Sequence, residues 1–246
     1  MSIPTIPAAY LLTVPVSFFA GLTQGLTGFG SALVAMPFFV EVLPPKQAVT
    51  LSVLNGLLIT SILTYRHRND IHLQNLSPLI MGAIPGVFLG IGFLKYSDEQ
   101  LIRHLLGGIV LSYSLYSLFK KNPVKRREIP RPWGVTAGFL TGLIGASFNA
   151  GGPPTIIYVT LTGWKKDEMK GTLSAFFLVT GLMISTGHFT TGLSNKTTFC
   201  LYLLNAPVVI VGVVAGMRAY SRVSAHIYLR IVLILLLAMG TILLLR

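Results

Sequence analysis

Apolar segments with short polar links between them fill almost the whole of this 246-residue chain. Hydrophobic residues make up 52% of the sequence, charged residues only 11%, and the mean hydropathy is +0.72. A helix needs an apolar run of about 20 residues to cross the hydrocarbon core of a bilayer. The pattern therefore predicts an all-α integral membrane protein, with a single transmembrane domain over residues 1–246 and no soluble catalytic domain.

We expect five apolar segments on each side of a basic cytoplasmic link at about residues 120–132. The first group forms repeat one, at about 8–119, and the second forms repeat two, at about 133–246. The expected segments lie at about 8–26, 27–43, 47–64, 76–95 and 101–119, and then at about 133–149, 151–163, 169–189, 198–217 and 227–245.

The two groups share their opening residues at a constant offset of 117 positions. The matches are Ala20, Gly21, Gly25, Leu26 and Gly28 with Ala137, Gly138, Gly142, Leu143 and Gly145. Later matches, such as Thr50-Leu51-Ser52 with Thr172-Leu173-Ser174, have slightly larger offsets, as loop insertions would produce. Glycine-broken apolar segments at matching places in two halves indicate the substrate site of a transporter.

Lysine and arginine in the loops predict the orientation of the chain, because such loops mark the cytoplasmic side. The positive clusters are Arg66 to Arg68, the link from Lys120 to Arg131, Lys165 to Lys170, and Arg218 with Arg222. If the first two segments of each repeat enter and return as a pair, all four clusters are cytoplasmic. Both termini are then on the outer side of the cell (inner) membrane, and the two repeats have inverted topology. If each pair is a single crossing, the repeats are parallel and Arg218 and Arg222 face outward, against the charge rule.

Two elements combine glycines with polar residues, Gln24 to Ser31 and Gly145 to Pro154. Glycine and proline disfavour the helix interior, so we expect broken or re-entrant helices at the centre, with new helices beginning near Ser31 and Pro153. Helix N-termini attract anions. The expected substrate-binding residues are Gln24, Thr27, Gly28, Gly30, Ser31, Asn55, Ser147, Asn149, Gly151, Gly152 and Thr155, with more polar contacts from the second element.

Close helix packing is the alternative explanation of the glycines, and it is the simpler one for Gly21, Gly25, Gly138 and Gly142. Asn55 and Asn205 likewise have two interpretations, because a buried amide must bond either to a neighbouring helix or to substrate.

The positions of the charged and titratable residues limit which kinds of transport and which kinds of site the chain can have. No Asp or Glu lies in the middle of an expected segment, which argues against cation transport, and the sequence predicts no metal site, cofactor or catalytic residue. Arg103 and Arg230 either extend to the lipid headgroups or attract an anionic substrate. His67 and His188, expected at interfacial segment ends, are either solvated or couple proton movement to transport.

The net charge of +12 does not indicate nucleic-acid binding, because the basic residues lie in loops where they set orientation and meet anionic lipid. The expected partners are a small anion, the lipid bilayer and, for coupling, protons. A homodimer is left open.

Four features occur in order along nearly the full chain: the glycine-rich stretch from Gly21 to Pro37, the step Pro44-Pro45-x-x-Ala48-Val49, the basic link, and Gly145-x-Ser147 followed by Gly151-Gly152-Pro153-Pro154. With these residues the chain resembles the sulfite exporter TauE/SafE family of membrane permeases. The resemblance implies secondary transport of a small sulfur-containing anion such as sulfite, thiosulfate or an organosulfonate.

We therefore expect a permease, not an enzyme, that works by alternating access around a mid-membrane anion site. A passive anion channel with the same donors and a permease for another small anion, such as a carboxylate, are the alternatives. An intramembrane enzyme would need a nucleophile, metal ligands or a buried acid–base pair, and the sequence shows none of these.

Overall fold

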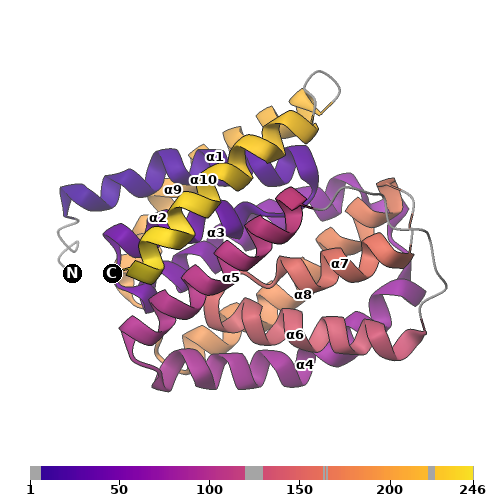
Figure 1. Ribbon diagram of the computed structural model, residues 1–246, viewed down its shortest axis with the longest axis horizontal. Coiled ribbons are helices and arrows are strands. Elements are labelled where there is room, and N and C mark those ends of the chain that lie inside the picture. Colours follow the sequence, from indigo (N-terminus) through magenta and orange to yellow (C-terminus); the bar gives the residue numbers. More distant parts are fainter. Residues whose placement is uncertain (1–6, 120–129, 163, 165, 221–224, 246) are drawn as a thin grey trace.

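The computed structural model describes residues 7–119, 130–162, 164, 166–220 and 225–245, and within these ranges all regular structure is helical (Figure 1). Most of the basic link, with Lys165 and Arg222, lies outside the described residues. The elements are the 3-10 helices η1 (Ala8–Leu12) and η2 (Arg68–Asp70) and the α-helices α1 (Thr13–Thr27), α2 (Ser31–Val42), α3 (Pro45–Arg66), α4 (Leu73–Tyr96), α5 (Glu99–Phe119), α6 (Arg131–Phe148), α7 (Gly152–Thr162), α8 (Lys166–Thr190), α9 (Lys196–Ala219) and α10 (Ala225–Leu245).

Among the described residues, 7 helical stretches are long and apolar enough to cross a membrane. They comprise η1 with α1, then α3, α4, α5 and α9, and most of α8 and α10. By contrast, α2 and α7 have 12 and 11 residues. At 1.5 Å per residue they measure only about 18 and 17 Å, against roughly 30 Å for the hydrocarbon core. Each short helix therefore reaches only part of the way across.

The two short helices return the chain toward the end from which it entered. In Figure 1, α1 runs away from the end of the bundle that holds the N-terminus, and α2 runs back toward it. The pair α6 and α7 does the same from the opposite end. The two pairs thus enter from opposite ends, which is consistent with the predicted inverted repeats.

Glycines let two helix pairs, α1 with α9 and α4 with α6, approach backbone to backbone. A Cβ on Gly21 would lie 2.7 Å from Val209 O, and one on Gly142 would lie 2.5 Å from Ala83 O. Favourable contacts need about 3.5–4.0 Å, so no larger residue fits. The other glycines in these interfaces are Gly25, Gly212 and Gly216, and Gly82, Gly86, Gly90 and Gly138. Close packing is thus confirmed for Gly21, Gly25, Gly138 and Gly142.

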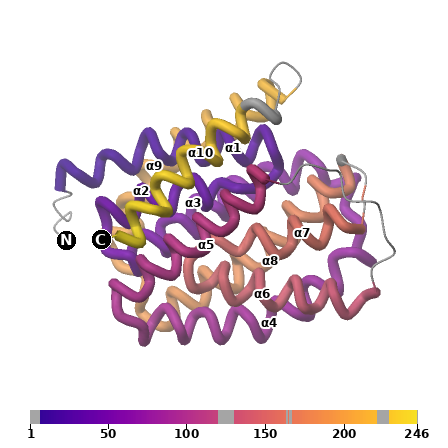
Figure 2. The backbone as a smooth tube through the Cα atoms, viewed as in Figure 1, coloured from indigo at the N-terminus to yellow at the C-terminus, as the bar shows by residue number. Residues whose placement is uncertain are grey.

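These interfaces join the two halves to each other. Helix α1 packs on α9, the counterpart of α4, while α4 packs on α6, the counterpart of α1. The counterparts α3 and α8 pack on each other, as do α5 and α10. Two repeats related by a two-fold axis would produce this pattern, in which each helix pair between the halves has a matching pair or is its own match. Figure 2 shows the result, because the indigo to magenta first half lies among the orange and yellow helices of the second.

The ends of the bundle differ in charge. Both termini lie toward one end (Figure 1). The described cationic residues Arg66, Arg68, Lys170 and Arg218 belong to the opposite end, where α3 and α9 finish and α8 begins. We call this the basic end. The predicted grouping is therefore observed for the described members of three of the four clusters, and the assignment of the basic end to the cytoplasm stays a prediction from the charge rule.

The glycine interfaces make a stability prediction that two positions of α4 can test. In Gly86→Ala the new Cβ would lie 2.9 Å from Leu143 N and nearer still to Phe139 O, whereas Gly92→Ala meets nothing within 4 Å. We expect the first variant to lose about 1–3 kcal/mol by overpacking. The second should gain up to about 1 kcal/mol in helix propensity. Thermal unfolding of the purified protein in detergent measures both, and equal midpoints would contradict the packing argument.

Candidate functional site

The first helix break separates α1 from α2 with two glycines in the left-handed region, Gly28 at φ 89° and Gly30 at φ 92°. Gly28 closes α1 by donating its N–H to Gln24 O at 2.7 Å. Left-handed backbone is strained for most other residues, so these glycines permit the chain to reverse within three residues. Helix α2 then begins at Ser31, as predicted.

The second break, between α6 and α7, uses an asparagine in place of the first glycine. Asn149 has φ 52° and donates its backbone N–H to Gly145 O at 2.8 Å. Asparagine tolerates this conformation better than other residues with a Cβ. Helix α7 begins at Gly152, and Pro153 and Pro154 occupy its first turn, where a missing N–H costs nothing. The expected helix start near Pro153 is confirmed.

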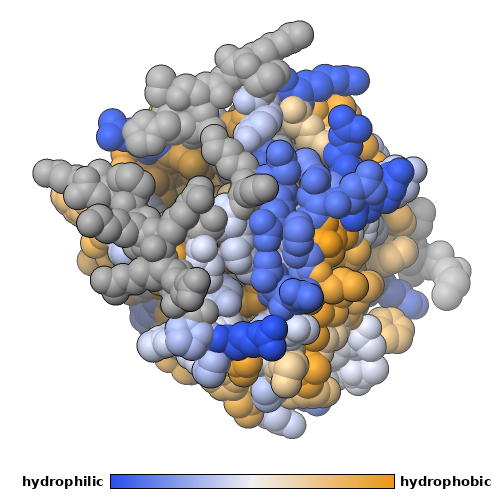
Figure 3. Space-filling model, turned by 90° about the vertical axis from the view of Figure 1, so that its right-hand side faces the viewer, coloured by the Kyte–Doolittle hydropathy of each residue, from blue (hydrophilic) through white to orange (hydrophobic). Residues whose placement is uncertain are grey.

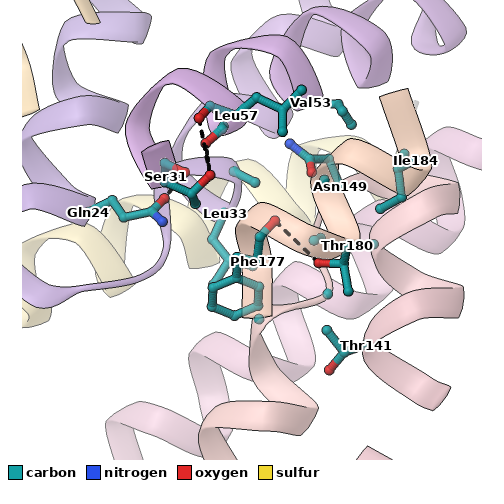
Figure 4. A pocket seen from close by; sticks show the side chains of 18 of the residues that line it. Gln24, Ser31, Leu33, Val53, Leu57, Thr141, Asn149, Phe177, Thr180 and Ile184 are labelled. Atoms are coloured by element: carbon teal, nitrogen blue, oxygen red, sulfur yellow. Dashed lines mark hydrogen bonds between the residues drawn. The ribbon is translucent and has the colours of Figure 1, made fainter. Parts of the chain in front are cut away.

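A cavity of ≈ 80 Å³ lies between the two breaks. One water needs about 10–15 Å³, so the cavity has room for a small ion and not for a large molecule. Figure 4 shows Ser31 and Asn149 on either side of this space, with Phe177 of α8 between them and Thr180 and Ile184 of the same helix on the side of Asn149. Its walls come from both halves: Gln24, Gly30, Ser31, Ala32, Leu33, Val53, Gly56, Leu57 and Thr60 from the first, and Thr141, Gly145, Asn149, Ala150, Gly151, Gly152, Phe177, Thr180, Gly181 and Ile184 from the second.

The polar side chains of this central cavity are held by neighbours. Ser31 Oγ donates to Gln24 Oε1, which fixes the two buried side chains together. Asn149 Nδ2 donates to Ser52 Oγ at 2.7 Å, which ties the second break to α3. Each amide nitrogen carries two hydrogens, so Gln24 and Asn149 keep donor capacity for a ligand.

Helix termini supply the electrostatic character of the central cavity, because no charged side chain lines it among the described residues. Both α2 and α7 present their first turns there, at Ser31 and Gly152. The first N–H groups of a helix have no partner within the helix, and its N-terminus carries about half a positive charge. At the start of α7 these donors are the N–H groups of Gly151 and Gly152, because Pro153 and Pro154 have none. The arrangement therefore favours an anion.

A comparison with protein families agrees with this geometry. The sequence model described as "Sulfite exporter TauE/SafE" matches residues 13–243, nearly the whole chain. The chain belongs to the TauE/SafE family. Membership implies a multi-pass membrane permease or exporter of sulfur-containing anions rather than an enzyme. A search of curated proteins found no match.

Six of the eleven substrate-binding residues predicted for this TauE/SafE protein line the central cavity. They are Gln24, Gly30, Ser31, Asn149, Gly151 and Gly152. Gly151 is also required for packing, because a Cβ there would lie 2.9 Å from Gly145 N. Gly28 shapes the first turn without lining the cavity.

The other four predicted residues bond elsewhere. Thr27 Oγ1 donates within its own turn, to Thr23 O at 2.8 Å or Phe29 O at 2.6 Å. Ser147 Oγ donates to Leu143 O at 2.8 Å. Thr155 pairs with Thr141, whose side chain is the one at the cavity wall.

Both mid-segment asparagines bond between helices. Asn55 Nδ2 donates to Ser17 Oγ at 3.0 Å, linking α3 to α1. Asn205 Nδ2 donates to Thr13 Oγ1 at 3.1 Å, linking α9 to α1. Of the two interpretations, the structure shows interhelical bonding at both positions.

The two predicted arginines lie outside the central cavity. Arg103 is half-buried near the start of α5, while Arg230 is exposed near the start of α10 and borders a neighbouring cavity. His67 lies at the basic end, 3.5 Å from Asp70. His188 lies in the last turn of α8, at a segment end as expected, but it is not solvated, since its side chain is fully buried and its Nε2 lies 3.3 Å from Ala146 O.

Threonines were missed by the sequence reasoning. Thr60, Thr141 and Thr180 line the cavity, so each half supplies three polar side chains among the described residues. The expectation of more polar contacts from the second half is therefore not met. Thr60 and Thr180 donate to carbonyls of their own helices, at 2.8 Å to Gly56 O and 2.9 Å to Phe176 O. In the sequence these threonines are marked only by a glycine nearby in the middle of the segment. Such pairs are common in membrane helices, so they do not single out a cavity residue.

The left-handed backbone of Asn149 makes a second stability prediction. Asn149→Gly keeps the conformation, whereas Asn149→Ala places a Cβ in a region that costs about 1 kcal/mol or more. We expect the alanine variant to melt below the glycine variant. At Asn75, in the right-handed helix α4, the order should reverse. Thermal unfolding of the four variants is the measurement, and the same order at both positions would contradict the assignment.

Proposed function

We propose that this TauE/SafE protein is a secondary permease that binds a small sulfur-containing anion in the central cavity and moves it by alternating access. The observation that carries the proposal is the meeting of two helix N-termini, one from each half, at a single cavity. Non-helical backbone at membrane depth is tolerated only where it is packed in protein or lines a cavity. Anion sites between broken helices of paired repeats are typical of secondary transporters.

Unequal packing of the two short helices supports alternating access. In α2 eight residues are buried, among them Met36 and Phe39, and the helix packs on α1, α3, α5 and α10. In α7 only Pro153, Thr155 and Val159 are buried. Equivalent elements in unlike surroundings are expected when a transporter is closed on one side of its site and open on the other.

A second cavity, of ≈ 280 Å³, lies beside the loosely packed helix α7. It shares Gly30 and Leu33 with the central cavity. Its other walls include the last turns of α5 and the first turns of α10, which lie toward the basic end. We infer that this conformation gives access to the central cavity from the basic end.

The charge of the site favours one anion class. Two helix N-termini contribute about one positive charge in total, and no charged side chain adds to it among the described lining residues. Moving an anion out of water costs free energy unless positive charge in the site compensates its own charge. A singly charged anion therefore fits this site better than a dianion. An organosulfonate or hydrogen sulfite is therefore our preferred substrate over sulfite or thiosulfate dianions.

Binding to purified protein tests the site directly. We expect Ser31→Ala and Asn149→Gly each to weaken methanesulfonate binding about ten- to a hundredfold, because each change removes or disturbs a polar group at the anion. Ser112→Ala, at an exposed position of α5, is the control and should bind as the wild type does. Isothermal titration in detergent is suitable, and full affinity in both site variants would refute the proposed site.

Flux separates a permease from a passive channel. In proteoliposomes with an imposed proton gradient, we expect methanesulfonate to accumulate against its own gradient. A channel would only equilibrate it. Failure of any ion gradient to drive accumulation, with downhill flux intact, would favour the channel.

A further inference from the structure

A third cavity, of ≈ 390 Å³, opens at the basic end of the bundle, separate from the central cavity. The last turns of α3 and α9, the start of α8 and the end of α1 surround it. Figure 3 looks onto this end, where hydrophilic residues gather between apolar flanks. We call this cavity the basic pocket; its lining consists of Gly25, Arg66, His67, Asp167, Lys170, Val214, Met217, Arg218 and Tyr220.

Cations outnumber anions on its walls. Among the described lining residues, Arg66, Lys170 and Arg218 face a single carboxylate, Asp167. His67 Nδ1 lies 3.5 Å from Asp70 Oδ2, and neither Arg66 nor Arg218 has a described carboxylate within 4 Å. Guanidinium groups present several donors in a fixed plane and bind tetrahedral oxyanions well.

Lys170 connects the basic pocket to the first helix break. Its side chain is only 8% exposed, and its Nζ lies 3.3 Å from the centre of the Tyr220 ring. A Cβ on Gly28 would lie 3.1 Å from Lys170 Cγ, so the stem of this lysine packs against the turn that shapes the central site. A buried cation thus separates the pocket from the break.

We propose that the basic pocket is a second oxyanion site, which holds the transported anion at the mouth of the permease before or after it occupies the central cavity. The role as a capture site rests on the proposed transport function; the binding of an oxyanion does not. Four helix ends enclose the pocket at the end of the bundle, which favours a free anion over the headgroup of a lipid at the side. Its three cations also suit a dianion, which the central cavity disfavours.

Sulfate is therefore the probe that distinguishes the two sites. In nanodiscs of zwitterionic lipid, we expect the double variant Arg66→Gln/Arg218→Gln to bind sulfate at least roughly tenfold more weakly than the wild type. Lys170→Met keeps the stem against Gly28 and should weaken sulfate binding as well. The control Lys95→Gln/Lys196→Gln removes the same charge from exposed positions at the opposite end and should bind sulfate as the wild type does.

The central site is tested separately by Asn149→Gly, which should leave sulfate binding intact. In the Arg66→Gln/Arg218→Gln background, where the basic pocket has lost two of its cations, Asn149→Gly should weaken methanesulfonate binding. Loss of the proposed function would appear as unchanged methanesulfonate binding in that variant. Wild-type sulfate affinity in Arg66→Gln/Arg218→Gln, with thermal unfolding as the check that it is folded, would overturn the basic pocket as an oxyanion site.

The source of the oxyanion is tested with phosphatidylglycerol. If the pocket takes a free anion, sulfate affinity should be the same in nanodiscs with and without this lipid. Sulfate binding that disappears when phosphatidylglycerol is present, together with retained lipid that the double variant loses in native mass spectrometry, would assign the pocket to a headgroup and overturn the capture role.

Discussion

Direct contact between helix backbones at glycines is the interaction on which the rest of this structure depends. Helices in lipid gain little from burying apolar side chains against each other, so close van der Waals packing has to hold them together. Here α1 meets α9 and α4 meets α6 at distances that exclude a Cβ. Because both interfaces cross from one half to the other, they also position the ends of α1 and α6, where the helices break.

The position of the central cavity follows from that placement. Two re-entrant helices start near each other, and their N-termini give the central cavity a positive potential without a lysine or arginine inside it. The described cations Arg66, Lys170 and Arg218 lie instead at the basic end, around the basic pocket. In the proposed mechanism the basic pocket would attract the anion and the central cavity would select it.

Much of this arrangement could be predicted, because glycine and proline act locally. The left-handed turns at Gly28 and Gly30 and the start of α7 at Gly152 follow from backbone preferences that any sequence displays. The direction in which each polar side chain points could not be predicted from the sequence. Thr27 and Ser147 turn to carbonyls of their own helices, and Thr60 and Thr180 reach the cavity from α3 and α8, because tertiary packing decides which face of a helix lies inward. The burial of His188 has the same origin.

The pairing of α1 with α9 also bears on how the chain is made. Helix α1 is synthesised first, and its glycine-lined face has no partner until α9 has been inserted, near the end of translation. By then α4 already has α6, which follows it after one intervening helix. The glycine face of α1 can therefore reach its native partner only after α9 is made, and the bundle is complete only when α10 has also packed on α5. A truncation that removes α9 would leave α1, the first helix to be synthesised, without its main packing partner.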